Sequence, residues 1–276
     1  MRTDEEIGLE QLELELLLDG LYRRWGYDLR SYSRASLGRR LRGLRASVEG
    51  ASSFSALQHL VLRDAGLAER LMAEVSMHSF SLFRAPATFR AFREHVVPWL
   101  RTYPFVRLWV AGCGSGEDVW SLAIVLAEEG LGDRARIYAT DVSNIVLARA
   151  WGGVLSGDAV QAAELDYAAA GGNATLHEHF TSDGEERAVR HDLRRNVVFF
   201  QHDLGSDASL NEFHVVFCRD VMIYFDDVLR ERAHRLLHAS LLRSGVLGLG
   251  AKETLQHTSY TARYEGLGHS LYRRVG

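Results

Sequence analysis

Long apolar runs are missing from this sequence. None reaches the ~18 residues that a membrane-spanning helix needs, and the acidic N-terminus lacks the apolar core of a secretion signal. We therefore expect neither membrane insertion nor export.

Cysteine and lysine are also scarce. Cys113 and Cys218, the two cysteines, have the spacing of neither zinc ligands nor a disulfide framework. This favours the reducing cytoplasm and predicts no metal site. Lys252 is the only lysine, so arginine supplies nearly all the positive charge. The net charge of −4 argues against a general affinity for nucleic acid.

The composition that remains is typical of a folded globular protein. The 276 residues are 47% hydrophobic and 25% charged, enough for one large domain or two modest ones. Over residues 8–75 the pattern predicts helices, of which the second is expected at about 36–48 and the third at about 53–64. The apolar positions at helical spacing in the first helix are Leu9, Leu12, Leu16, Leu17 and Leu21.

Arginine is concentrated in this helical region. Eight arginines and one acid, Asp28, lie between residues 23 and 45. The pattern allows two interpretations, a solvated helix face or a docking surface for an acidic partner. The arginines of the expected helix 34–48 are Arg34, Arg39, Arg40, Arg42 and Arg45.

From residue 106 strands and helices alternate, which predicts an α/β fold with a mostly parallel sheet covered by helices on both faces. We divide the chain into a helical domain with its linker, 1–85, and an α/β domain, 86–276. Residues 152–196 are irregular and could hold a small antiparallel insertion. The expected strands are 106–111, 136–140, 197–201, 214–218 and 246–250, with 259–264 and 270–274 closing the sheet edge; the expected helices are 117–129, 144–151 and 226–242.

A glycine-rich turn follows the first of these strands. Gly112, Gly114 and Gly116 would let the backbone approach a ligand, and the N–H groups of the next helix would face it. Glu117 and Asp118 argue against a phosphate and suit a ligand with hydroxyls or positive charge. A tight turn without a ligand is the alternative.

Asp141 ends the next expected strand, about 25 residues after the turn, where an acidic residue can hold a ribose. It could instead cap the helix that begins near Asn144.

Residues 217–226 read F-C-R-D-V-M-I-Y-F-D and closely resemble the F-C-R-N-V-M-I-Y-F-D signature of the CheR family of chemotaxis receptor methyltransferases. Three other segments resemble family motifs in the same order. They are A-G-C-G-S-G-E at 111–117, A-T-D at 139–141 and L-L-R-S-G-V-L at 241–247. The arginine-rich helix looks like the family's N-terminal helical domain, so the resemblance covers about residues 12–274.

The resemblance implies a Rossmann-like methyltransferase sheet and S-adenosylmethionine (SAM) as methyl donor, with S-adenosylhomocysteine (SAH) as product. The implied acceptor is a glutamate carboxylate on the cytoplasmic helical bundle of a chemoreceptor, whose acidic faces the arginines at 34–45 would contact. It also implies catalytic roles for Arg84 and Tyr224. The implied cofactor contacts are His78, Phe80, Arg84, Gly112, Gly114, Gly116, Glu117, Asp141, Asp203, Leu204, Arg219 and Asp220.

Transfer of a methyl group to a carboxylate needs no general base, because a glutamate with a pKa of ~4.3 is already ionised. The enzyme must supply alignment and a dry site. Arg84 is the candidate for holding the acceptor carboxylate and Tyr224 for a hydroxyl contact near the methyl group. Alternatively, Arg84 closes a loop through an ion pair and Tyr224 is a core aromatic. His202 and His214 are interpreted as structural.

Four positions depart from the family's motifs. His78 and Phe80 replace an asparagine and a threonine of N-x-T-x-F-F-R, and Asp203 and Asp220 each replace an asparagine. Two alternative functions therefore stay open: methylation of another protein or a small carboxylate, and a SAM- or SAH-binding sensor or scaffold with weak catalysis. A nucleic-acid methyltransferase is disfavoured, since no N-P-P-Y-type tetrad is present.

Overall fold

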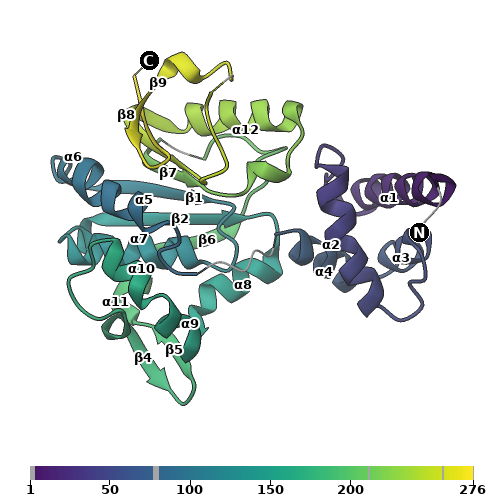
Figure 1. Ribbon diagram of the computed structural model, residues 1–276, viewed down its shortest axis with the longest axis horizontal. Coiled ribbons are helices and arrows are strands. Elements are labelled where there is room, and N and C mark those ends of the chain that lie inside the picture. The colour runs from purple at the N-terminus through teal and green to yellow at the C-terminus, as the bar shows by residue number, and fades with distance from the viewer. Residues whose placement is uncertain (1–3, 77–80, 211, 257, 276) are drawn as a thin grey trace.

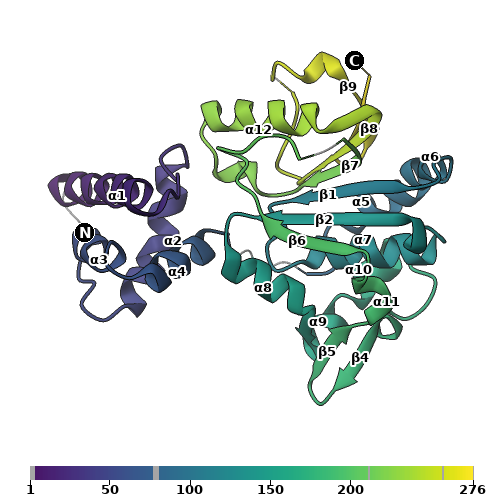
Figure 2. The same cartoon turned by 180° about the vertical axis from the view of Figure 1, so that it is seen from behind.

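The computed structural model describes residues 4–76, 81–210, 212–256 and 258–275. A group of helices at the N-terminal end lies beside a larger α/β part, and α4 lies against α8 of that part (Figures 1 and 2). The helices of this group are α1 (Asp4–Trp25), α2 (Arg34–Ser47), α3 (Phe54–Val61) and α4 (Ala65–Ser76).

The core of the helical part is built from one leucine stripe of α1. Leu14, Leu17, Leu18 and Leu21 are buried together with Phe54 of α3. Of the leucines at helical spacing, Leu17 and Leu21 are buried, whereas Leu9, Leu12 and Leu16 are exposed. The helix carries two leucine stripes, and the helices packed beside it cover only one of them.

The α/β part is organised on a seven-stranded sheet in the order β6-β2-β1-β7-β8-β10-β9. The first five strands are parallel to their neighbours, and β10 and β9 add an antiparallel edge. The strands are β1 (Val106–Ala111), β2 (Ala135–Asp141), β6 (Val197–Gln201), β7 (Phe213–Cys218), β8 (Leu241–Leu249), β9 (Tyr264–Gly268) and β10 (Leu271–Arg274).

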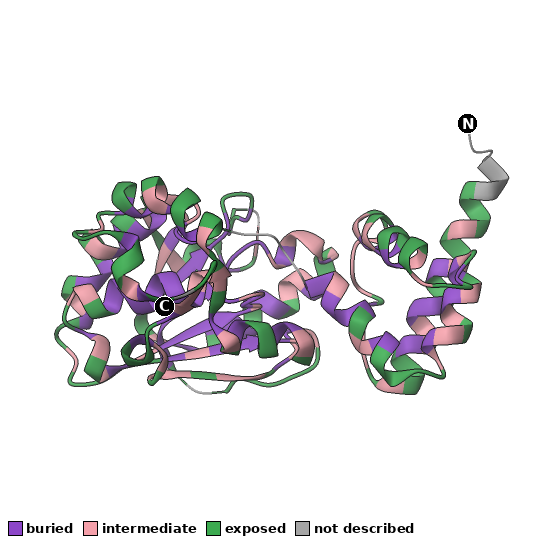
Figure 3. Cartoon of the chain, turned by 90° about the horizontal axis from the view of Figure 1, so that it is seen from below, coloured by how far each residue is buried: buried purple, intermediate pink, exposed green. Residues whose placement is uncertain are grey.

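Helices cover both faces of this sheet, as predicted. One face packs against α5 (Pro86–Ala91), α7 (Glu117–Glu128) and α8 (Asn144–Gly152), and the other against α12 (Asp227–Ala239). Figure 3 shows that buried residues follow the strands and the inward sides of these helices. Asp226 caps α12, because its Oδ1 accepts from the Leu229 N–H at 2.8 Å.

The tail differs from its prediction. Residues 261–263 form a 3-10 turn rather than a strand, and β9 begins only at Tyr264. The ring of the preceding Tyr260 packs on His238 of α12, with 5.3 Å between centroids, which draws this segment out of the sheet.

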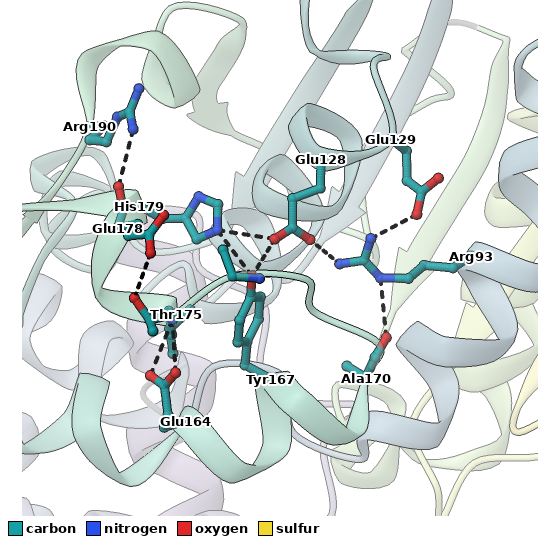
Figure 4. A network of polar contacts seen from close by, with 12 residues as sticks. Arg93, Glu128, Glu129, Glu164, Tyr167, Ala170, Thr175, Glu178, His179 and Arg190 are labelled. Carbon is teal, nitrogen blue, oxygen red and sulfur yellow. Dashed lines mark hydrogen bonds and ion pairs between the residues drawn. The ribbon is translucent and has the colours of Figure 1, made fainter.

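The insertion at 152–196 contains the expected antiparallel sheet, in the order β3-β5-β4. A buried polar network ties this insertion to α7 (Figure 4). Glu128 contacts Tyr167, Arg93 and His179, the last at 3.2 Å. Because buried charges need partners, this network fixes the insertion against the sheet. The elements of the insertion are β3 (Val154–Ser156), α9 (Gly157–Ala162), α10 (Glu164–Ala169), β4 (Phe180–Asp183), β5 (Glu186–Val189) and α11 (His191–Arg194).

Candidate functional site

The glycine turn lies at the carboxyl end of β1, where parallel sheets bind ligands. Gly112 has φ +67°, and a Cβ there would lie 2.5 Å from Cγ2 of Val221 in the loop after β7. Gly116, with φ +98°, precedes α7. The N–H of Gly114 donates to Oδ2 of Asp141 at 3.1 Å. The turn and the end of β2 are therefore held together.

Asp141 is almost fully buried, and burial raises the pKa of its carboxyl. Its Oδ1 accepts from the Ser143 N–H at 3.0 Å. The cap of α8 is Ser143 itself, whose Oγ accepts from the Val146 N–H. The alternative that Asp141 caps this helix is therefore wrong.

A small cavity brings together five predicted site residues, Gly112, Asp141, Asp203, Leu204 and Tyr224. Sequence reasoning missed the remaining lining residues as parts of a site, because contacts between distant segments put them there. These are Tyr32, Val75, Ser76, Val142, His202, Val221 and Phe225.

The cavity measures about 40 Å³, more than the ~10–15 Å³ that one water molecule needs and far below the ~300 Å³ of a typical ligand site. Tyr32 and Tyr224 are the half-buried aromatic side chains that line it. This space is smaller than a nucleoside.

Glu117 lies next to the glycine turn, at the start of α7. Its Oε1 accepts from Ser115 Oγ at 2.7 Å, whereas its buried Oε2 has no hydrogen-bond partner among the described residues. Burial raises the pKa of this carboxyl. An ammonium group would supply the missing partner, and ribose hydroxyls suit Asp141. This set of groups fits SAM, which carries both.

Arg84 lies in a loop whose neighbours Phe83 and Ala85 both have positive φ. Its guanidinium forms an ion pair with Asp220, and its carbonyl accepts from Arg219 Nη2 at 2.7 Å. The alternative of a loop-closing ion pair is therefore realised in this structure. Burial and the nearby Arg219 lower the pKa of Arg84.

Arg219 lies behind this loop. Its side chain is buried, donates from Nη1 to Asp118 Oδ1 at 2.6 Å and lies 5.3 Å from the ring centroid of Phe89. These contacts position residue 84. A direct cofactor contact of Arg219 stays a prediction.

Asp203 lines the cavity together with its neighbours His202 and Leu204. Asp203 Oδ1 accepts from the Gly205 N–H at 2.7 Å, and burial raises the pKa of this carboxyl. His202 contacts the Ala208 carbonyl through Nε2 at 3.0 Å, while its buried Nδ1 has no partner among the described residues. His202 thus borders the site. His214 accepts from the Arg107 N–H at 3.1 Å and is structural, as expected.

Glu253 is a buried carboxylate that sequence reasoning missed. It accepts from the N–H groups of Asp220 at 2.8 Å, Met222 at 2.8 Å and Gly250 at 2.7 Å. Three such bonds fix the loop between β7 and Tyr224. No local motif marks this residue.

Tyr224 receives contacts from the helical part of the chain. Its carbonyl accepts from the Ser33 N–H at 2.7 Å, and the ring of Tyr32 packs on Phe225 with 4.9 Å between centroids. Arg40 lies over the Tyr224 ring. The interpretation of Tyr224 as a core aromatic is too simple, since this half-buried ring joins both parts of the molecule at the cavity.

The predicted docking arginines have unequal surroundings. Arg42 and Arg45 pair with Glu10 at 3.2 and 3.5 Å, and Arg34 lies 4.0 Å from Glu15. Arg39 is exposed. The arginine-rich surface is therefore partly neutralised by α1.

Two predicted cofactor contacts, His78 and Phe80, lie outside the described residues. Within the described ranges, no group of three or more His, Cys, Asp or Glu side chains could hold a metal ion. Among these same residues, no helix combines the length and apolar character needed to cross a membrane. Cys113 and Cys218 are buried free thiols.

Two protein-family models match the chain: the CheR methyltransferase SAM-binding domain over residues 79–267 and the CheR all-alpha domain over residues 12–76. Cher3 of Pseudomonas putida, named as a methyltransferase, is 40% identical over 93% of both chains. Two proteins named chemotaxis protein methyltransferase are also similar. That of Listeria monocytogenes is 28% identical over 83% of this chain and 85% of its own. Chemotaxis protein methyltransferase 1 of Pseudomonas aeruginosa is 30% identical over 73% of this chain and 75% of its own.

Proposed function

Because this chain belongs to the CheR family of SAM-dependent protein methyltransferases, we propose that it forms methyl esters on glutamate side chains of chemoreceptor cytoplasmic domains. The observation that carries this proposal is the meeting of Asp141, the glycine turn and Tyr224 at the carboxyl edge of β1, β2 and β7.

Bound SAM supplies a methyl group that its sulfonium makes electrophilic. Asp141 would hold the ribose hydroxyls and Glu117 the ammonium group, while Gly112 lets the turn pack closely against Val221. Arg84 would orient the acceptor carboxylate, with Tyr224 contacting the same region through its hydroxyl. No residue has to remove a proton, because the acceptor is already ionised at neutral pH.

The proposal includes docking of an acidic receptor bundle on α2, with the reaction taking place in the cytoplasm. Arg39 is the most available of the five predicted docking residues, since α1 carboxylates pair with Arg42 and Arg45.

The test is incubation of the purified protein with tritiated SAM and soluble receptor cytoplasmic fragments. We expect tritium in base-labile form, because glutamyl methyl esters hydrolyse in alkali. Tight SAH binding in calorimetry without label on any of several receptors would instead favour a sensor or scaffold. The His78→Asn/Phe80→Thr double variant tests the other alternative. If these two positions reshape the pocket for a different acceptor, the variant gains no receptor methylation.

A further inference from the structure

Asp220 pairs with the guanidinium of Arg84, the group proposed to orient the acceptor carboxylate. The residue is 6% exposed, and its carboxylate forms an ion pair with Arg84, whose side chain is 36% exposed. The partially open guanidinium therefore already has an internal carboxylate on its buried side.

The position of Asp220 is fixed by its backbone. Its φ is +59°, its N–H donates to Glu253 Oε2 at 2.8 Å, and a Cβ on Gly250 would lie 2.6 Å from Oδ1. The carboxylate is thus held in a close-packed corner. Arg84 is held from the other side, through the bond between its carbonyl and Arg219.

Each of the two guanidinium groups near the Arg84–Asp220 pair already has a carboxylate partner. Arg219 is bound to Asp118 at 2.6 Å, and Arg84 to Asp220. Glu117 and Glu253 add two further carboxylates nearby, of which Glu253 is satisfied by backbone N–H groups. An incoming acceptor carboxylate therefore meets a neutral ion pair and not a bare cation.

We propose that Asp220 is a specificity-determining residue that competes with the acceptor carboxylate for the Arg84 guanidinium. This rests on the proposed function, because it takes the acceptor group to be a carboxylate. Acceptors that bind only through that group are selected against. An acceptor docked elsewhere on the surface gains the local concentration needed to share Arg84.

Asp220→Asn tests the proposal, because asparagine has the same size and tolerates positive φ. We expect the KM for a receptor cytoplasmic fragment to fall about tenfold, the size of one charge-assisted contact. SAH affinity is measured alongside, because Asp220 is also a predicted cofactor contact. Asp220→Ser, which also frees Arg84, should give the same fall in KM. Asp192→Asn, which opens the exposed Arg190–Asp192 pair, is the matched control and should leave KM unchanged.

The outcomes separate this inference from the proposed function. If the wild-type protein labels the receptor and both Asp220 variants keep its KM, the inference alone is overturned. Reduced SAH affinity without a fall in KM also overturns it, since Asp220 would then be a cofactor ligand. Labelling by the Asp220 variants alone supports it. Absence of methyl esters with every variant overturns the proposed function and, with it, the inference.

Discussion

Arg40 of α2 lies over the ring of Tyr224, with 4.4 Å between the guanidinium carbon and the ring centroid. The same guanidinium donates to the carbonyls of Glu74 at 3.3 Å and Val75 at 3.0 Å. One side chain therefore joins α2, the end of α4 and the turn that carries the candidate catalytic tyrosine. A partner that moves α2 would move this ring.

Replacing Arg40 by alanine should lower kcat, because Tyr224 loses the group that orients its ring. Cation–π contacts contribute ~0.5–2 kcal/mol, so we expect a loss of about 2- to 30-fold in methyl transfer. Steady-state kinetics with a receptor fragment measures the effect. Arg39→Ala, an exposed position on the same helix, should raise KM and leave kcat unchanged. If both variants raise KM equally and leave kcat unchanged, Arg40 only docks the substrate.

Asp141→Ala should weaken SAH binding by about 10- to 100-fold, the range expected for losing hydrogen bonds to a charged group. Calorimetric titration of the purified variant gives this number. Ser143→Ala is the matched control: it removes the α8 cap, which lowers the free energy of unfolding by ~1 kcal/mol, and should keep SAH affinity. Full affinity in Asp141→Ala would mean that this carboxylate only holds the turn.

Glu117→Gln should separate stability from binding. Glutamine keeps an acceptor for Ser115 and removes a buried charge, so the ligand-free variant should unfold at an equal or higher temperature. Its SAH affinity should fall about tenfold through loss of the ammonium contact. Burial raises the pKa of Glu117, so wild-type affinity should decline towards low pH as this carboxyl becomes protonated. Binding titrations between about pH 5 and 8 should show that SAH affinity depends less on pH in the variant than in the wild type.

The parts of the fold around the candidate site that the sequence predicts correctly depend on contacts near in sequence or on strand order. β1, its glycine turn and Asp141 follow from an apolar run, turn glycines and the next strand end. Parallel pairing then brings the ends of β1 and β2 to one edge without further information.

The parts that could not be predicted depend on which surface packs against which. The buried stripe of α1 contains Leu14 and excludes Leu12, although both belong to helical leucine patterns. Tyr32 reaches the cavity only because the helical part docks on Phe225, and Glu253 acts through backbone N–H groups of a distant loop. Neither residue lies in a motif, so residue type and spacing give no indication of them.

Two substitutions at the proposed docking surface on α2 should change the KM in opposite directions. Arg39→Glu should raise the KM for a receptor fragment, because it reverses an exposed charge in the proposed docking surface for an acidic bundle. Glu10→Gln should lower that KM, because it releases Arg42 and Arg45 from their shared carboxylate. Both effects should shrink at high salt, and SAH affinity should stay constant. Insensitivity of KM to both substitutions would place the receptor elsewhere.

The stability of the protein should depend on pH through His238 of α12. Burial, with Arg274 and Arg263 nearby, lowers the pKa of His238 to about 4, whereas an unfolded histidine titrates near ~6.5. Between these values the unfolded chain binds the extra proton, so the free energy of unfolding should fall as the pH drops from about 6.5 to 4. Above that window His238 contributes no slope.

His238→Phe removes this proton site and keeps a ring between Tyr260 and Tyr264. The variant loses the 3.1 Å contact with the Tyr264 hydroxyl, so its stability at neutral pH should be lower by ~1 kcal/mol. Its unfolding free energy should nevertheless vary less with pH across the window, as measured by urea unfolding at a series of pH values. Burial also lowers the pKa of His234 on the same helix, so a second phenylalanine there should flatten the profile further. A His238→Phe variant that keeps the full wild-type slope would assign the acid sensitivity to His234.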